Sequence, residues 1–372
     1  MNKRMIVTTL AFLASSHAMA QSSVTLYGVL DEAIRYQNNP NSTTAKGSEV
    51  SLAEGAISGS SWGLRGNEDL GGGAQAIFGL ESGYNLPTGK IDQQGQIFGR
   101  FAWMGLSQTT YGTLKVGRQY GNAFYFDGFI FDPIGGGNIT ATDWELFLIG
   151  CRYDNTADYT NQFGPIGVEF QQSLGGQPGS FSEGSTSSGS LYYNGSALTL
   201  GLMAQQSKDA ESHKLTIGSA GADYVVGPVK FYSYYIYARR DAGFQIGTSG
   251  TSDPLANTSL MNNVTTALGP QTDARTDQYF KVGVGYQAMA SLRLTLAYAY
   301  DHAKNVAPGE NGTMMTLYGI ADYVLSKRTD IYLEVDDSHI SGASVGDPNS
   351  PLATAPGVRQ VFGTSVSLRT RF

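Results

Sequence analysis

Hydrophobic and polar residues alternate with a period of two over many short segments of the chain. In the terminal segment 365–372, the apolar residues Val366, Leu368 and Phe372 share one parity, and the serines and arginines share the other. The segment 292–300 repeats this pattern. A period of two is that of a β-strand with one apolar face and one polar face. The pattern therefore predicts an all-β fold.

About sixteen segments, each of roughly ten residues, carry this alternation, which is the length of a strand that crosses a membrane in a barrel. The expected strands are 24–36, 57–67, 73–85, 97–109, 112–118, 151–162, 166–173, 187–194, 197–206, 213–226, 229–240, 276–288, 291–303, 313–326, 328–338 and 363–372.

The connections between these strands are alternately short and long over much of the chain. The short ones hold turn residues, as in Glu68–Gly72, Thr110–Gly112, Gly227–Pro228 and Leu325–Lys327. The long polar ones are 37–56, 119–150, 174–186, 241–275 and 339–362. This rhythm predicts an antiparallel transmembrane β-barrel with short periplasmic turns and long extracellular loops. Closure of the barrel leaves no unpaired edge in the bilayer. The alternative is a soluble two-sheet protein with a buried apolar face.

The first twenty residues are typical of a secretory signal peptide. Lys3 and Arg4 precede an apolar stretch over 5–14, and Ala18-Met-Ala20 matches a cleavage site. An N-terminal membrane anchor is the alternative, but the apolar stretch is too short to span a bilayer. We therefore expect 1–20 to be a cleaved signal peptide and 21–372 to be the exported barrel domain.

Composition supports the same class of protein. The chain holds 48 Gly, 22 Tyr and 17 Phe with only 15% charged residues, which suits strands and tight turns. Without Lys3 and Arg4, 22 basic residues face 31 acidic ones, a net charge of −9 that argues against nucleic-acid binding. The single cysteine, Cys151, excludes an internal disulfide, and we expect it to fill space in the wall.

Several stretches resemble the general porins of Gram-negative outer membranes, of the β-proteobacterial type. SSVTLYGVLDEAI at 22–34 looks like the opening strand of that family. The match continues in the second hairpin, in the fourth, fifth and fifteenth strands and at the last residue, that is in 58–85, FGRFAWMGL at 98–106, GTLKVGRQYG at 112–121, YVLSKRTDIYLEV at 323–335 and Phe372. The similarity extends over the mature chain and is strongest in its first hundred residues and at its end.

The resemblance implies a sixteen-stranded barrel in the cell outer membrane, usually a homotrimer in contact with lipid and lipopolysaccharide. It implies a general diffusion porin for passive passage of ions and small hydrophilic solutes, without cofactor or metal. The terminal Phe372 matches the signal that the outer-membrane assembly machinery recognises. In the family, the third long loop folds into the lumen and narrows the pore. Here 119–150 lacks alternation and is rich in Phe, which suits a packed loop.

A pore for hydrophilic solutes needs a wet constriction with charges of both signs facing across it. On the basic wall we expect Arg65, Arg100, Lys115 and Arg152; the family's basic wall contains matches for the first two and for the region of the last. The expected loop acids are Asp127 and Asp132, with Asp143 and Glu145 ranked lower. The acidic stretch usual in the family is sparse here. Inward parity assigns Glu81 and Glu334 to the lumen, and each charge has the alternative of a solvated lumen residue remote from the constriction.

Arg118 shares the outward parity of Leu114 and Val116. An arginine that faces lipid is costly, so either a bulge turns it inward or a neighbouring subunit covers it. The resemblance to trimeric porins favours the second explanation. Asp92, in the loop near 90–96, is then the expected partner from the adjacent subunit.

Three other functions compete with a general porin. A hydrolase would need a nucleophile and a base, but His213, His302 and His339 lie in no serine or metal motif, so we expect no enzyme activity. An adhesin or structural barrel would tolerate a plugged lumen. A substrate-specific channel would show a ladder of aligned aromatic residues or arginines. The Tyr-rich strand 231–237 hints at such a ladder, although an interfacial girdle explains it more simply.

Overall fold

The computed structural model describes residues 23–39, 47–248, 250–253, 255–263, 271–352 and 357–372. The expected signal peptide, 1–20, lies outside these ranges. The first nine strands are β1 (Ser23–Asn38), β2 (Ser48–Glu54), β3 (Ser61–Gly71), β4 (Ala74–Asn85), β5 (Lys90–Ile91), β6 (Phe101–Gln108), β7 (Gly112–Tyr120), β8 (Arg152–Phe163) and β9 (Ile166–Ser173). The next nine are β10 (Thr186–Asn194), β11 (Leu198–Lys208), β12 (Lys214–Val226), β13 (Val229–Arg240), β14 (Arg275–Met289), β15 (Leu292–Ala307), β16 (Glu310–Val324), β17 (Thr329–Gly342) and β18 (Gln360–Arg371).

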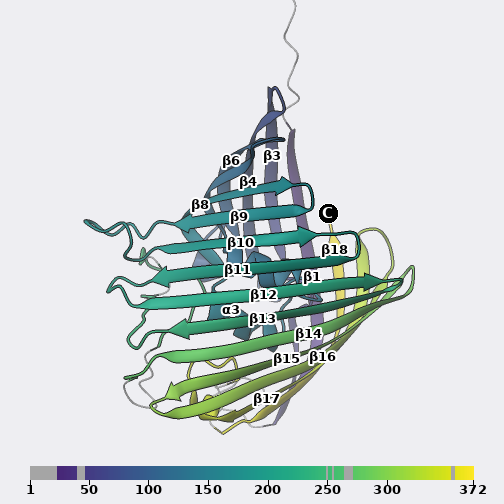
Figure 1. The fold of residues 1–372 in the computed structure, drawn as a ribbon. Coiled ribbons are helices and arrows are strands. Elements are labelled where there is room, and N and C mark those ends of the chain that lie inside the picture. Colours follow the sequence, from purple (N-terminus) through teal and green to yellow (C-terminus); the bar gives the residue numbers. More distant parts are fainter. Residues whose placement is uncertain (1–22, 40–46, 249, 254, 264–270, 353–356) are drawn as a thin grey trace, which may run out of the picture.

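These strands form a closed antiparallel barrel with sixteen positions in its wall. β2 and β3 share one position, because both pair with β1 on the same side, and β5 pairs only with the end of β4. Successive strands from β6 to β18 pair with their neighbours, and β9 to β17 lie side by side in Figure 1. The predicted fold class is thus confirmed.

The wall is apolar outside and polar inside, the reverse of a soluble domain. On β17, Leu333 and Val335 are 48% and 39% exposed, whereas Tyr332, Glu334 and Asp336 are buried. β18 follows the same rule, with Leu368 exposed and Ser367 buried. Such alternation is expected of a barrel whose outer face contacts lipid. None of the helices in the described ranges is long and apolar enough to cross a membrane.

The last strand closes the barrel by pairing with the first. Residues 29–37 of β1 pair with 363–371 of β18. Beyond this ladder, the backbone of Phe372 exchanges two hydrogen bonds of 3.1 Å with Gly28, and its side chain remains half-exposed on the outer face. The closing role predicted for the terminal strand is confirmed by this register.

The second wall position differs from the prediction. β2 lies within the expected loop 37–56, and the strand expected over 57–67 begins only at Ser61. Between them, residues 55–60 leave the wall, and we call this segment the ledge. A Cβ at Gly55 would lie 1.8 Å from a carboxylate oxygen of Asp31, so only glycine permits this close approach.

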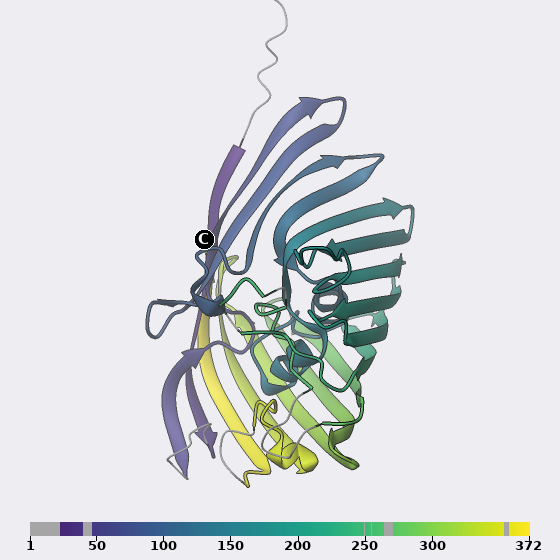
Figure 2. The same ribbon diagram turned by 90° about the vertical axis from the view of Figure 1, so that its left-hand side faces the viewer.

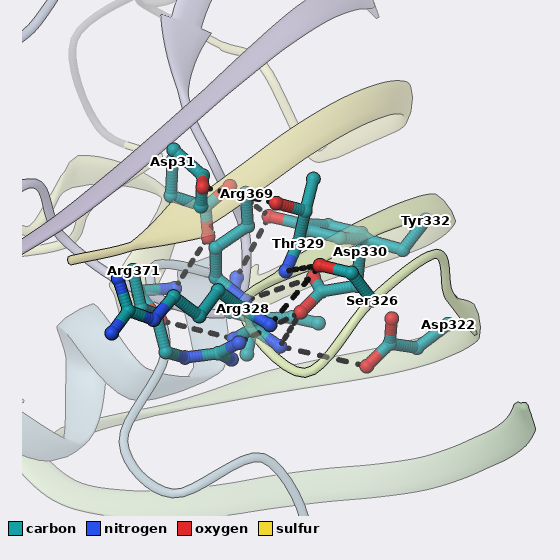
Figure 3. A network of polar contacts seen from close by, with 12 residues as sticks. Asp31, Asp322, Ser326, Arg328, Thr329, Asp330, Tyr332, Arg369 and Arg371 are labelled. Carbon is teal, nitrogen blue, oxygen red and sulfur yellow. Dashed lines mark hydrogen bonds and ion pairs between the residues drawn. The ribbon is translucent and has the colours of Figure 1, made fainter.

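Three strands from opposite ends of the chain hold the ledge. The carboxylate of Asp31 on β1 accepts hydrogen bonds from the Ser58 backbone N–H and the Tyr332 hydroxyl, at 3.0 and 2.8 Å. Arg369 on β18 donates to the Ser58 hydroxyl at 3.1 Å. Asp330 forms ion pairs with both Arg369 and Arg371, at 3.0 and 2.9 Å (Figure 3).

The connection between β7 and β8 folds into the barrel, where its helical turns lie inside the ring of strands (Figure 2). We call it the third loop. It contains α2 (Asn122–Phe124), the π-helix η2 (Tyr125–Ile130) and α3 (Thr140–Ile149). Phe126 and Phe131 are fully buried and occupy the space that Cβ atoms at Gly201 and Gly221 would fill. Two short 3-10 helices, η1 (Gln93–Gly95) and η3 (Ala343–Gly346), lie in other loops.

Candidate functional site

Two cavities extend into the barrel from opposite rims and meet in its middle. The larger, of about 1000 Å³, reaches the short turns between β6 and β7 and between β8 and β9. The smaller, of about 540 Å³, reaches Gln93 in the loop after β4 and Ser259 in the loop after β13. Four residues line both cavities: Glu81, Arg100, Tyr120 and Phe129. We call this set the junction, and it lies between the cavity from one rim and the cavity from the other.

A single carboxylate links two of the predicted basic residues at the junction. The Arg100 Nε lies 2.6 Å from Glu81, and the Tyr27 hydroxyl donates to the same carboxylate at 2.6 Å. The Arg65 guanidinium is farther from Glu81, at 3.9 Å, and lies over the Tyr27 ring, with its centre 4.2 Å from the ring centroid. The Arg65 side chain is 60% exposed, so it is the most accessible of these cations to solute in the larger cavity.

The other two predicted basic residues flank the junction on either side. Arg152 lines the smaller cavity, where its guanidinium lies 4.6 Å from the Tyr120 ring centroid and donates to the Tyr120 hydroxyl at 3.0 Å. Lys115 lines the larger cavity and forms an ion pair of 2.8 Å with Asp158. Glu334 lies elsewhere on the wall, buried against Arg35 at 2.9 Å.

The predicted loop acids do not face this basic wall. Asp127, Asp132 and Glu145 are buried beneath the third loop against β12, β13 and β14. Ser219 donates to Asp127, and Tyr234 donates to Glu145. Asp143 is exposed on α3. Among the described residues, the lining of the two cavities that meet at the junction includes none of these four acids.

Lys281 on β14 binds two of the loop acids, Asp132 and Glu145, and sequence reasoning missed it. Its ammonium lies 2.5 Å from Asp132 and 3.2 Å from Glu145, and its side chain is fully buried. Its position on the inward-facing parity of β14 was the signal in the sequence that could have indicated a lumen residue. The partnership with residues more than a hundred positions earlier in the chain left no local pattern.

The face that the third loop turns toward the cavities is aromatic. Tyr125 and Phe129 are 46% and 39% exposed. The Phe129 ring contacts those of Tyr120, Phe124 and Tyr125 edge-on, with centroid distances of 5.1, 5.1 and 5.7 Å. Sequence reasoning took the Phe content of the loop as packing alone. The four-residue spacing of Tyr125 and Phe129, one helical turn, was the signal for an exposed aromatic face.

Arg118 finds its partners within its own chain. Its guanidinium forms an ion pair of 2.7 Å with Asp154 and donates to the backbone carbonyls of Gly99 and Asn257 at 2.7 and 3.3 Å. The pairing of β7 with β8 shifts register between Gly117 and Gln119, which is the bulge considered from the sequence. Asp92 forms no ion pair with Arg118 or with any other described residue.

Comparison with known proteins agrees with this architecture. The Gram-negative porin family matches residues 7–343. An outer membrane porin protein of Bordetella pertussis is 40% identical over 190 residues, which make up 46% of this chain. The match spans about half of that relative, 48% of its length.

Among solved structures, an anion-selective porin from Comamonas acidovorans has a TM-score of 0.70 at 21% identity, over 95% of this chain and 100% of its own. The trimer form of OmpT, an outer membrane protein of Vibrio cholerae, has a TM-score of 0.64 at 13% identity, over 94% of this chain and 99% of its own. These two likenesses concern the fold. Because the family match extends over most of the sequence, the chain belongs to the Gram-negative porins.

Proposed function

We propose that the protein is an outer-membrane diffusion channel through which ions and small hydrophilic solutes pass passively. The observation that carries this proposal is the meeting of two cavities from opposite rims at four shared side chains. The apolar outer wall and the family membership support a location in the outer membrane. We ascribe no reaction to the lumen, and the proposal needs no cofactor.

The proposed pore wall consists of Arg65, Arg100, Arg152, Lys115 and Glu81. Glu81 neutralises Arg100 and Asp158 neutralises Lys115, so the positive charge that remains beside the junction is that of Arg65 and Arg152. With the loop acids turned away, this arrangement differs from a constriction with opposed charges. It favours a preference for anions, in spite of the negative net charge of the whole chain.

We further propose that the channel works as a homotrimer, inserted by the outer-membrane assembly machinery among lipid and lipopolysaccharide. An apolar hollow of about 530 Å³ on the outer wall, over β1, β3, β4, β6 and β7, supports contact with a second copy. Leu106 and Val116 are exposed there. Native mass spectrometry of the detergent-solubilised protein tests this assembly, and a purely monomeric folded barrel would overturn it.

Planar bilayer recordings test the channel directly. We expect stepwise, ohmic conductance, with steps in groups of three for a trimer. Folded protein that inserts and gives no channels would overturn the proposal, and would favour the non-conducting adhesin or structural barrel.

Reversal potential under a salt gradient tests the pore wall. Arg65→Gln and Arg100→Ala are expected to shift selectivity toward cations, because each removes positive charge beside the junction. Arg239→Gln is the matched control, since Arg239 is 49% exposed at the end of β13 and pairs with Asp241. Equal reversal potentials for all three variants and the wild type would show that Arg65 and Arg100 do not line the permeation path.

A further inference from the structure

We propose that the junction binds small aromatic carboxylates, so that the channel prefers them to aliphatic acids of equal charge. This inference rests on the proposed channel function and deepens it, because it names a class of solute. The site comprises the exposed ring of Phe129, the ring of Tyr120, and the guanidinium groups of Arg65 and Arg152 on either side. Each part of the argument concerns one of these elements.

Phe129 lies where the lumen spaces converge. It lines the two cavities of the junction and also a third, of about 340 Å³, on the far side of the loop. Its ring is 39% exposed, although its edges are packed against Tyr120, Phe124 and Tyr125. A large aromatic surface held rigidly in a narrow aqueous passage is favourable for a passing solute that can stack on it.

The aromatic cluster continues across the junction onto the barrel wall. Phe101 lies 6.4 Å from Tyr120 and 6.0 Å from Trp103, measured between ring centroids. Both Phe101 and Trp103 line the larger cavity. A flat ring entering from either rim therefore meets aromatic surface on the loop and on the wall, which suits an aromatic solute better than a strongly hydrated one.

On either side of Phe129 lies an arginine without a close carboxylate, Arg65 in the larger cavity and Arg152 in the smaller one. Within the described part of the chain, Arg152 forms no ion pair and its Nε has no hydrogen-bond acceptor. Arg65 reaches Glu81 only at 3.9 Å and is 60% exposed. A guanidinium binds a carboxylate through two parallel hydrogen bonds, and the exposed Arg65 can still offer that edge. In Arg152 the Nε is buried and one terminal nitrogen donates to Tyr120, so the other terminal nitrogen is the donor left for a solute.

The third loop does not compete for these arginines. Three of its four acids are bound to β12, β13 and β14, with Asp132 and Glu145 both held by Lys281, and Asp143 lines neither cavity of the junction. Arg100 is already paired with Glu81 at 2.6 Å. The negative charge that would complete the site must therefore come from the solute. A benzoate-like molecule supplies it together with a ring, and can pass from Arg152 to Arg65 while stacked on Phe129.

Block of the chloride current by organic acids tests the proposal. Benzoate, cyclohexanecarboxylate and acetate carry the same charge, and the first two have similar size. We expect saturable block by benzoate with a half-blocking concentration about three- to tenfold lower than that of cyclohexanecarboxylate, because aromatic pairs add to simple apolar contact. Acetate should be weaker than both. Equal half-blocking concentrations for benzoate and cyclohexanecarboxylate would overturn the proposal.

Two variants locate the site, each compared with its own open current. Phe129→Leu keeps an apolar side chain and removes the ring, so the advantage of benzoate over cyclohexanecarboxylate should disappear. Arg152→Gln should raise the half-blocking concentrations of benzoate and cyclohexanecarboxylate by a similar factor. The control is Phe163→Leu, since Phe163 is 57% exposed on the outer wall, and its block should equal that of the wild type. An undiminished benzoate advantage in Phe129→Leu would also overturn the proposal.

Calorimetric titration of the detergent-solubilised protein with benzoate separates this inference from the proposed function. Suppose that benzoate binds, that Phe129→Leu weakens this binding, and that the protein gives no channels. This result would support the proposed binding site and overturn the proposed channel function. Normal channels without benzoate binding or block would sustain the channel and overturn the site.

Discussion

Lys281 on β14 and Asp132 in the third loop form an ion pair of 2.5 Å in which neither side chain is exposed. The same ammonium reaches Glu145, at the other end of the loop, at 3.2 Å. One basic residue of the wall thus binds the loop at two points that are thirteen positions apart in sequence. Because both contacts are shielded from water, removing one partner would cost far more stability than the loss of a surface ion pair.

Lys281→Met is expected to release the third loop. Removing one partner leaves two carboxylates buried without their cation, which costs about 3–5 kcal/mol in the free energy of unfolding. Equilibrium unfolding measures the cost, and limited proteolysis within 121–150 reports the loosened loop. Arg239→Met is the control, because Arg239 and its partner Asp241 are 49% and 29% exposed and their pair should contribute only about 0–1 kcal/mol. Equal stability of the two variants would contradict this account.

Asp127→Asn is expected to change the free energy of unfolding very little, whereas Asp132→Asn is expected to lower it. Burial and the neighbouring Glu145 carboxylate raise the pKa of Asp127, which favours its protonated form. An amide oxygen can still accept the hydrogen bond from Ser219, so the loss should be about 1 kcal/mol or less. Asp132→Asn removes a charged partner of Lys281 and should cost about 1.5–3 kcal/mol. Thermal unfolding of both variants checks the order, and the reverse order would refute it.

Gly221→Ala on β12 is expected to disturb the seat of the third loop. The added Cβ would lie 2.3 Å from the buried ring of Phe131, so the ring or the loop must move, at about 1–3 kcal/mol. Gly218→Ala on the same strand is the control, since a Cβ there meets nothing within 4 Å. The unfolding midpoint should fall only for Gly221→Ala. Equal midpoints would show that the ring adjusts without cost.

Arg118 and Asp154 are expected to be energetically coupled. In a double-mutant cycle of Arg118→Gln and Asp154→Asn, the double variant should lose less stability than the sum of the single variants, by about 1 kcal/mol. Native mass spectrometry should show the same oligomer for all of them, and for Asp92→Ala. Additive losses combined with dissociation of Arg118→Gln would instead indicate a partner in a neighbouring subunit.

Local pattern predicted the wall well, because a strand in a membrane barrel shows its two faces in its own sequence. The segments 166–173 and 229–240 coincide with β9 and β13. The ledge at 55–60 could not be found in this way, since it depends on Asp31, Tyr332 and Arg369, which are near only in the closed barrel. In β2, Val50 and Leu52 do alternate with polar residues, but the segment is short and lies within a long polar stretch, so the pattern predicted a loop there.

Parity also predicted which wall residues point inward, and Arg65, Arg100 and Glu81 lie together in the lumen. It could not orient the loop acids, because the third loop is helical and a period of two does not apply to it. Their direction is decided by Lys281 and Tyr234 on strands that come much later in the chain. The alternation of the strands therefore gave no information on which side of the loop these acids would occupy.

The ledge also holds the third loop, because the Asn138 backbone N–H donates to the Ala56 carbonyl at 2.8 Å. That carbonyl is in position only when β1, β17 and β18 have come together around residues 55–60. The position of the third loop, and with it the bore of the channel, therefore depends on the seam where the two ends of the chain pair. An open barrel would lack this attachment, so closure of the wall and placement of the loop are structurally linked.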